Sequence, residues 1–191
     1  MVPTTESTLR RTYPHHTWHL VDEGDSGAFV HHLTGRGPEL HAKIVPRSPE
    51  NPAFDHAGEA DRLDWLTRHG VPVPRVVERG ADDTTAWLVT EAVPGVAASE
   101  EWPEHQRAAV VVAIAELART LHELPVDDCP FGRRLDVADR HADLALAARE
   151  LAIDEGPWFG PEYAERFLER YGAHRVDQER TAFHQLLDEF F

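Results

Sequence analysis

The chain has 191 residues, of which 41% are hydrophobic and 28% are charged, as in folded globular proteins. Its formal net charge of −15 argues against a nucleic-acid or anionic-membrane surface and is compatible with a cationic ligand. Cys129 is the only cysteine, which excludes a disulfide framework and a cysteine metal cluster. The sequence shows no signal-peptide pattern and no apolar run of membrane-spanning length. We therefore expect a cytoplasmic protein.

The first part of the chain predicts a small antiparallel sheet. Residues 1–12 are polar, and we expect them to be irregular. Five strand patterns and one helix pattern follow up to Gly95. The strands are expected at 18–21, 28–33, 40–45, 75–79 and 86–91, and the helix at 54–69. The turn at 22–27 consists of small residues whose amides could approach a phosphate, although most such turns are only turns.

Lys43 is the only lysine of the chain. It lies in the third expected strand, and a compact ammonium on a flexible stem acts as a point charge towards phosphate. The alternative is that one lysine survived by chance in an arginine-rich chain. Glu59 falls on the apolar face of the expected helix, beside Leu63 and Leu66, where an acid needs a charged partner. A strand lysine followed by a helix glutamate is the arrangement that protein kinases use to hold ATP phosphates.

The second part of the chain predicts helices. A helix begins at Pro103 and ends before Pro125. One apolar stripe is expected along it, formed by Val110, Ile114, Leu117, Leu121 and Leu124. Further helices are expected from about 136 to 153, from 161 to 172 and from 177 onward. The fold class is α+β, with a β-rich front lobe joined to a helical rear lobe.

Two histidine patterns indicate neither a metal site nor a catalytic loop. The pairs at 15–16 and 31–32 are poor metal sites, because adjacent strand residues point to opposite faces. His141 and Asp143 have the spacing of a kinase catalytic loop, which also needs an asparagine five residues after the aspartate. Ala148 stands there instead, inside an amphipathic helical pattern. The only asparagine of the chain is Asn51.

Several stretches, in the right order over nearly the whole chain, resemble aminoglycoside 3′-phosphotransferases, a family with a protein-kinase-like fold. They are 22–27, 41–44, 58–66, 71–74, 86–95, 121–125, 128–130, 138–145 and 186–191. The resemblance implies a nucleotide-binding N-lobe and hinge over residues 1–95, with five antiparallel strands and one helix. It implies a truncated helical C-lobe over residues 96–191, with a C-terminus that faces the aminoglycoside.

The resemblance also implies roles for single residues. Lys43 would contact the α- and β-phosphates of ATP, and Glu59 would fix Lys43. The remaining nucleotide-binding residues would be Ser26 and Gly27 over the phosphates, and Thr90 to Ala92 as the hinge that bonds adenine. The cationic aminoglycoside would be held by Asp154 or Glu155, with Asp188, Glu189 and the terminal carboxylate of Phe191. Arg149 falls where the family has an arginine near the substrate site. Without the resemblance, the better interpretation of these acids is a solvent-exposed helix end.

The family pattern is interrupted near residues 136/137, as though an internal block had been removed. In the family, that block carries the catalytic loop, with its aspartate base and magnesium-binding asparagine, and an Asp-x-Gly turn. We therefore assign no catalytic base and no metal ligand. ATP and magnesium are implied by the family, and the magnesium site is predicted to be absent here. We also expect uncovered apolar surface on the two helices that flank the join.

Three functional readings follow. The chain is an internally deleted aminoglycoside kinase, inactive as written. Alternatively, it is a remnant that binds nucleotide or aminoglycoside without transforming it. In the third reading, it is a fragment that folds only with a partner supplying the missing part. The preferred aminoglycoside and the oligomeric state are left unassigned.

Overall fold

The computed structural model describes residues 5–21, 28–47, 56–125, 129–130, 140–152 and 159–188. The chain divides into two compact units, with the boundary between Pro94 and Gly95, and residues 129 and 130 belong to the first unit. Within the described ranges, no helix is long and apolar enough to cross a membrane.

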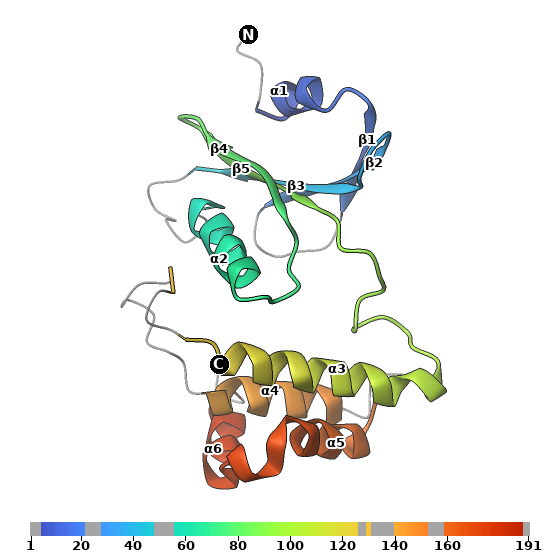
Figure 1. The fold of residues 1–191 in the computed structure, drawn as a ribbon, viewed down its shortest axis with the longest axis vertical. Helices are drawn as coiled ribbons and strands as arrows, with labels where there is room; N and C mark the ends of the chain where they lie inside the picture. Colours follow the sequence, from blue (N-terminus) through green and yellow to red (C-terminus); the bar gives the residue numbers. More distant parts are fainter. Residues whose placement is uncertain are drawn as a thin grey trace. The chain divides into compact units, whose positions relative to one another are not determined.

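The first unit is built on one five-stranded antiparallel sheet (Figure 1). In chain order, the strands are β1 (His16–Val21), β2 (Phe29–Gly35), β3 (Leu40–Pro46), β4 (Val76–Ala81) and β5 (Thr85–Glu91). Their order across the sheet is β1-β2-β3-β5-β4. The structure thus confirms the expected α+β class and all five strands, which are short and alternate in burial as strands at a sheet surface do.

Two helices lie on opposite faces of this sheet, α1 (Thr5–Thr12) and α2 (His56–Arg68) (Figure 1). The prediction of an irregular start was wrong, because Leu9 of α1 is only 2% exposed and packs into the sheet. The other buried members of this core are Leu33, Leu40, Ala42, Ile44 and Val89. Glu6 and Arg10 pair one helical turn apart, and the Arg10 guanidinium lies 4.8 Å from the centre of a Trp18 ring.

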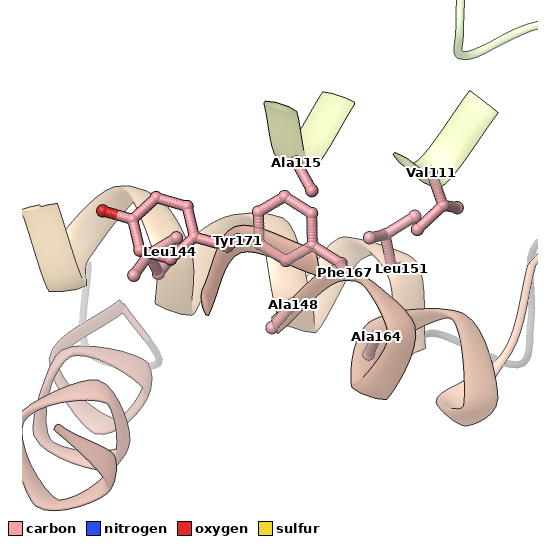
Figure 2. Close-up of a cluster of buried hydrophobic side chains, with 8 residues drawn as sticks. All are labelled: Val111, Ala115, Leu144, Ala148, Leu151, Ala164, Phe167 and Tyr171. Atoms are coloured by element: carbon pink, nitrogen blue, oxygen red, sulfur yellow. The ribbon is translucent and has the colours of Figure 1, made fainter. Parts of the chain in front are cut away.

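The second unit consists of helices. They are α3 (Glu104–His122), α4 (Arg140–Ala152), α5 (Pro161–Gly172), the short 3-10 helix η2 (Ala173–Arg175) and α6 (Gln178–Asp188). Helix α5 packs against α3 and α4, and α6 packs against α4. Figure 2 shows the core between them, in which Phe167 and Tyr171 of α5 are the largest fully buried side chains.

The face of α3 that packs inward differs from the predicted stripe. Val111 and Ala115 are fully buried against α5, whereas Leu117 and Leu121 are 42% and 39% exposed. Small side chains on the packed face let the bulky rings of Phe167 and Tyr171 approach the helix (Figure 2). Of the predicted stripe, Ile114 packs against this core, whereas Leu117 and Leu121 are partly exposed, as is Leu146 of α4.

The His141 stretch is helical, as predicted, and serves packing. His141 of α4 is 6% exposed, and its Nε2 accepts the backbone N–H of Asp177 at 3.0 Å. The Asp177 carboxylate in turn accepts the backbone N–H groups of Glu179 and Arg180 at the start of α6. Asp143 lies 3.0 Å from Nε2 of His122 on α3. These contacts hold helix ends together.

Candidate nucleotide site on the sheet

The sheet face opposite α1 carries the candidate site. Side chains two residues apart on a strand share a face, so His41 and Lys43 point to the same side of β3. The strand register places Thr90 of β5 opposite His41 and Leu88 opposite Lys43. Helix α2 lies on this side, and its Glu59 reaches Lys43. The site thus combines β3, β5 and α2.

The predicted Lys43–Glu59 pair is formed. The Lys43 ammonium donates to a Glu59 carboxylate oxygen at 2.9 Å, with the two side chains 31% and 33% exposed. Glu59 lies in the first turn of α2, where a negative charge suits the helix dipole. The carboxylate holds the flexible lysine stem on one side of the sheet. The ammonium is thereby oriented and still accessible, which suits the binding of phosphate oxygens.

The segment predicted as an adenine-binding hinge, residues 90–92, consists of the last two residues of β5 and the residue after it. The backbone N–H of Glu91 donates to the Arg75 carbonyl at 2.9 Å, and that of Ala92 donates to the Glu39 carbonyl at 2.8 Å. The side chains of Arg75 and Glu91 form an ion pair, whose hydrogen bond lowers the pKa of Glu91. A base bound here would have to displace the Ala92 bond or use other backbone groups of the segment.

His41 lies on the same strand face as Lys43, and the sequence argument did not single it out. Its ring stacks on that of His32, with centroids 4.9 Å apart and planes inclined by 21°. Burial lowers the pKa of His41, the neighbouring His32 adds to this, and Glu39 opposes it. The ring therefore favours its neutral form. Counting back two residues from Lys43 would have found it, because that step keeps the face of the strand.

The remaining predicted residues are placed as follows. Thr90 lies in β5 beside His41, on the Lys43 face. Arg149 lies in α4 and donates to Glu150 at 2.8 Å. Asp188 is the last residue of α6. Outside the described residues lie Ser26, Gly27, Asp154, Glu155, Glu189 and Phe191. The structure thus brings together Lys43, Glu59 and Thr90.

The described residues contain no group of three or more His, Cys, Asp or Glu side chains that could hold a metal ion. Asn51 and the predicted join at 136/137 lie in the ranges that the structure leaves undescribed. The predicted absence of the magnesium site therefore stays a prediction.

Known proteins resemble this chain over most of its length. It is 60% identical over 262 aligned positions to an aminoglycoside 3′-phosphotransferase of Streptomyces ribosidificus, covering 97% of this chain and 100% of that protein. Among solved structures, it is similar to an aminoglycoside-3′-phosphotransferase of type VIII, with a TM-score of 0.78 and 38% identity over 96% of this chain and 97% of that one. Both comparisons agree with the predicted kinase-like fold.

The alignment to the S. ribosidificus protein spans 71 positions more than the 191 residues of this chain, so at least that many positions have no counterpart here. A streptomycin 3″-kinase of Streptomyces griseus matches 66% of this chain, about 126 residues, over 131 positions at 44% identity and covers 45% of that protein. Because about 126 residues of this chain fill the 131 aligned positions, this match contains no long gap in this chain. Any continuous stretch of about 126 residues includes 66–126, so the missing positions lie outside this range, as does the predicted join.

The family assignment rests on these similarities together with a match to a family model. The model of the phosphotransferase enzyme family matches residues 17–185, which include the Lys43–Glu59 pair and most of both units. This chain belongs to the phosphotransferase enzyme family and, within it, to the aminoglycoside 3′-phosphotransferases.

Proposed function

We propose that this chain is an aminoglycoside 3′-phosphotransferase that keeps the ATP-binding lobe but lacks the segment where phosphoryl transfer occurs. The observation that carries the proposal is the Lys43–Glu59 ion pair on the sheet face beside Thr90. In this arrangement the lysine contacts the α- and β-phosphates of ATP, and Glu59 keeps it in place. The adenine base of ATP would bind near His41 and residues 90–92, and by family likeness Ser26 and Gly27 would contact the phosphates.

Transfer itself needs further groups. Phosphoryl transfer is mainly positioning and charge neutralisation, with a base-position aspartate and metal ligands. Magnesium would supply charge neutralisation at the phosphates. Asn51 is the only asparagine, and no aspartate stands five residues before it in a His-x-Asp pattern. Loss of one preorganised electrostatic group costs about a hundred- to a thousand-fold in rate, so loss of the whole set leaves no useful turnover.

The second ligand is a cationic aminoglycoside. The net charge of −15 is compatible with such a ligand. By family likeness, Arg149, Asp154 or Glu155, Asp188, Glu189 and the Phe191 carboxylate face it. A reducing cytoplasm suits a chain with the single cysteine Cys129.

Two alternatives are favoured by particular observations. The intact Lys43–Glu59 pair also fits a remnant that binds nucleotide or aminoglycoside without turnover. The exposed Leu117 and Leu121 of α3 fit a fragment that folds stably only with a partner supplying the missing part.

The test is to incubate the purified chain with ATP, magnesium and kanamycin or neomycin, and to analyse the aminoglycoside by mass spectrometry. We expect no added phosphate. A phosphorylated product that depends on Lys43 would contradict the proposed loss of transfer. Saturable aminoglycoside or ATP binding without product favours the binding remnant. A chain that binds neither and lacks a cooperative unfolding transition favours the partner-dependent fragment.

A further inference from the structure

Two neighbours hold the His41 ring. His32 of β2 lies opposite His41 in the strand register and stacks on it at 4.9 Å. The His32 ring has a second contact, because its Nε2 lies 3.0 Å from the Glu39 carboxylate. An ionised carboxylate only accepts hydrogen bonds, so the Nε2–H of His32 donates to it and one ring orientation is selected.

Glu39 connects this pair to the segment after β5. Its carboxylate binds His32, and its backbone carbonyl accepts the N–H of Ala92 at 2.8 Å. Glu39, the residue before β3, thus contacts both a ring on β2 and the last residue of the predicted hinge, Ala92. Along the chain, His41 lies between Glu39 and Lys43.

The charged and titratable groups around His41 come from several elements. His32 faces it from β2, Glu39 precedes β3, and Lys43 follows on the same strand face with Glu59 of α2 as its ion-pair partner. His19 of β1 pairs in register with His32, and its own Nε2 lies 3.2 Å from the Thr34 hydroxyl. His32 stacks on His41, whereas His19 is one strand further away. This difference makes His19 a matched control.

We propose that Glu39 and His32 are positioning residues, in which Glu39 orients the His32 ring and His32 holds His41 as a stacking surface for the base of the nucleotide. This inference rests on the proposed ATP site. Aromatic rings bind nucleobases by stacking, typically with about 1–3 kcal/mol per base. A ring that is already oriented loses less side-chain freedom when the base binds.

The proposal separates recognition of the base from recognition of the phosphates. Lys43 acts on phosphate oxygens, so it contributes to binding of ATP and of inorganic tripolyphosphate, which has no base. The His32–His41 stack contributes to ATP only. A pair of titrations with these two ligands therefore distinguishes a positioning role from general damage to the site.

The experiment measures binding of ATP and tripolyphosphate to the full chain by calorimetry. We expect His32→Ala to weaken ATP binding about five- to tenfold and to leave tripolyphosphate binding unchanged. Glu39→Gln is expected to act in the same direction with a smaller effect. His32→Phe keeps a stacking ring and should retain the ATP affinity, and His19→Ala should change neither ligand.

A second readout follows the His41 ring by NMR as the pH is varied. Because burial and His32 both lower the pKa of His41, His32→Ala should raise it. Because Glu39 opposes that effect, Glu39→Gln should lower it further. Such opposite shifts would show that His32 and Glu39 both act on the His41 ring.

The outcomes are distinguishable. If ATP binds in a Lys43-dependent way but His32→Ala leaves the ATP affinity unchanged, the positioning role is overturned and the proposed ATP site stands. If the wild-type chain binds neither ATP nor tripolyphosphate, the proposed site fails and this inference fails with it.

Discussion

At the scale of single residues, Lys43 and Glu59 show how far local sequence pattern reaches. The lysine was identified by its uniqueness and the glutamate by its helical spacing, and the structure joins them at 2.9 Å. The His32–His41 stack escaped the same reasoning, since it depends on the register of two strands. The Ala92 N–H, donated to Glu39, likewise depends on a contact between distant backbone segments.

The first residue-scale prediction concerns ATP affinity. Lys43→Ala should weaken ATP binding by about ten- to a hundredfold, because a hydrogen bond to a charged group contributes about 1.5–3 kcal/mol. Calorimetry measures it. Asp61→Asn is the matched control, because Asp61 also lies on α2 and pairs with Arg79 instead. An equal loss in both variants would contradict a specific role of Lys43.

The second residue-scale prediction concerns pH. His31 is 6% exposed, beneath α1 and beside Trp18. Burial lowers its pKa from 6.5, Glu6 partly opposes this, and Arg10 adds to it. The unfolded chain therefore binds this proton more readily, and the stability contributed by neutral His31 is present above pH 6.5 and lost as the pH falls.

Urea unfolding at pH 7.5 and 5.5 checks this dependence. The free energy of unfolding should fall less between these pH values in His31→Phe than in the wild-type chain. The same substitution at the exposed His19, on the other sheet face, should leave the wild-type fall unchanged. Identical falls in all three proteins would refute the role of His31.

At the scale of elements, the two helices of the first unit differ in how clearly the sequence pattern predicts them. Helix α2 has a clear end, since Gly70 and Pro72 follow it. Helix α1 has a single large apolar residue, Leu9, among polar neighbours. A sequence pattern with one apolar position has no period, so only the sheet that covers Leu9 reveals that it belongs to the core.

Helix α1 should contribute substantially to stability. Leu9→Ala should lower the free energy of unfolding by about 2–5 kcal/mol, because the side chain is buried among well-packed neighbours. Chemical denaturation gives this value. Arg11→Ala, on the exposed side of the same helix, should change it by less than about 0.5 kcal/mol. A small loss for Leu9→Ala would mean that α1 does not pack as described.

At the scale of the whole molecule, two features go together: this chain lacks positions that its relative has, and the second unit exposes apolar side chains. The relative from S. ribosidificus aligns over 71 more positions than this chain has residues, and α3 exposes Leu117 and Leu121. The sequence predicted uncovered apolar surface on the two helices that flank the join, and Leu146 of α4 is also exposed. It did not predict which face of α3 packs, because Val111 and Ala115 became the core through contact with α5.

This exposed face should bind a hydrophobic dye. The double substitution Leu117→Gln and Leu121→Gln should reduce ANS fluorescence and aggregation, while the free energy of unfolding stays within about 0.5 kcal/mol. Leu20→Gln removes an exposed apolar side chain from the first unit and should have a much smaller effect on the dye. Unchanged ANS binding in the α3 variant would show that this face is covered in solution.

The central claim is that this chain keeps the family's ATP site and lacks transfer because the missing positions carry it. The most direct measurement compares kanamycin phosphorylation, by mass spectrometry, in this chain and in a version with the missing segment of the S. ribosidificus protein inserted between Asp136 and Val137. We predict no product from the chain as it stands and Lys43-dependent product from the restored version. Phosphorylated kanamycin formed by the 191-residue chain alone would contradict the claim.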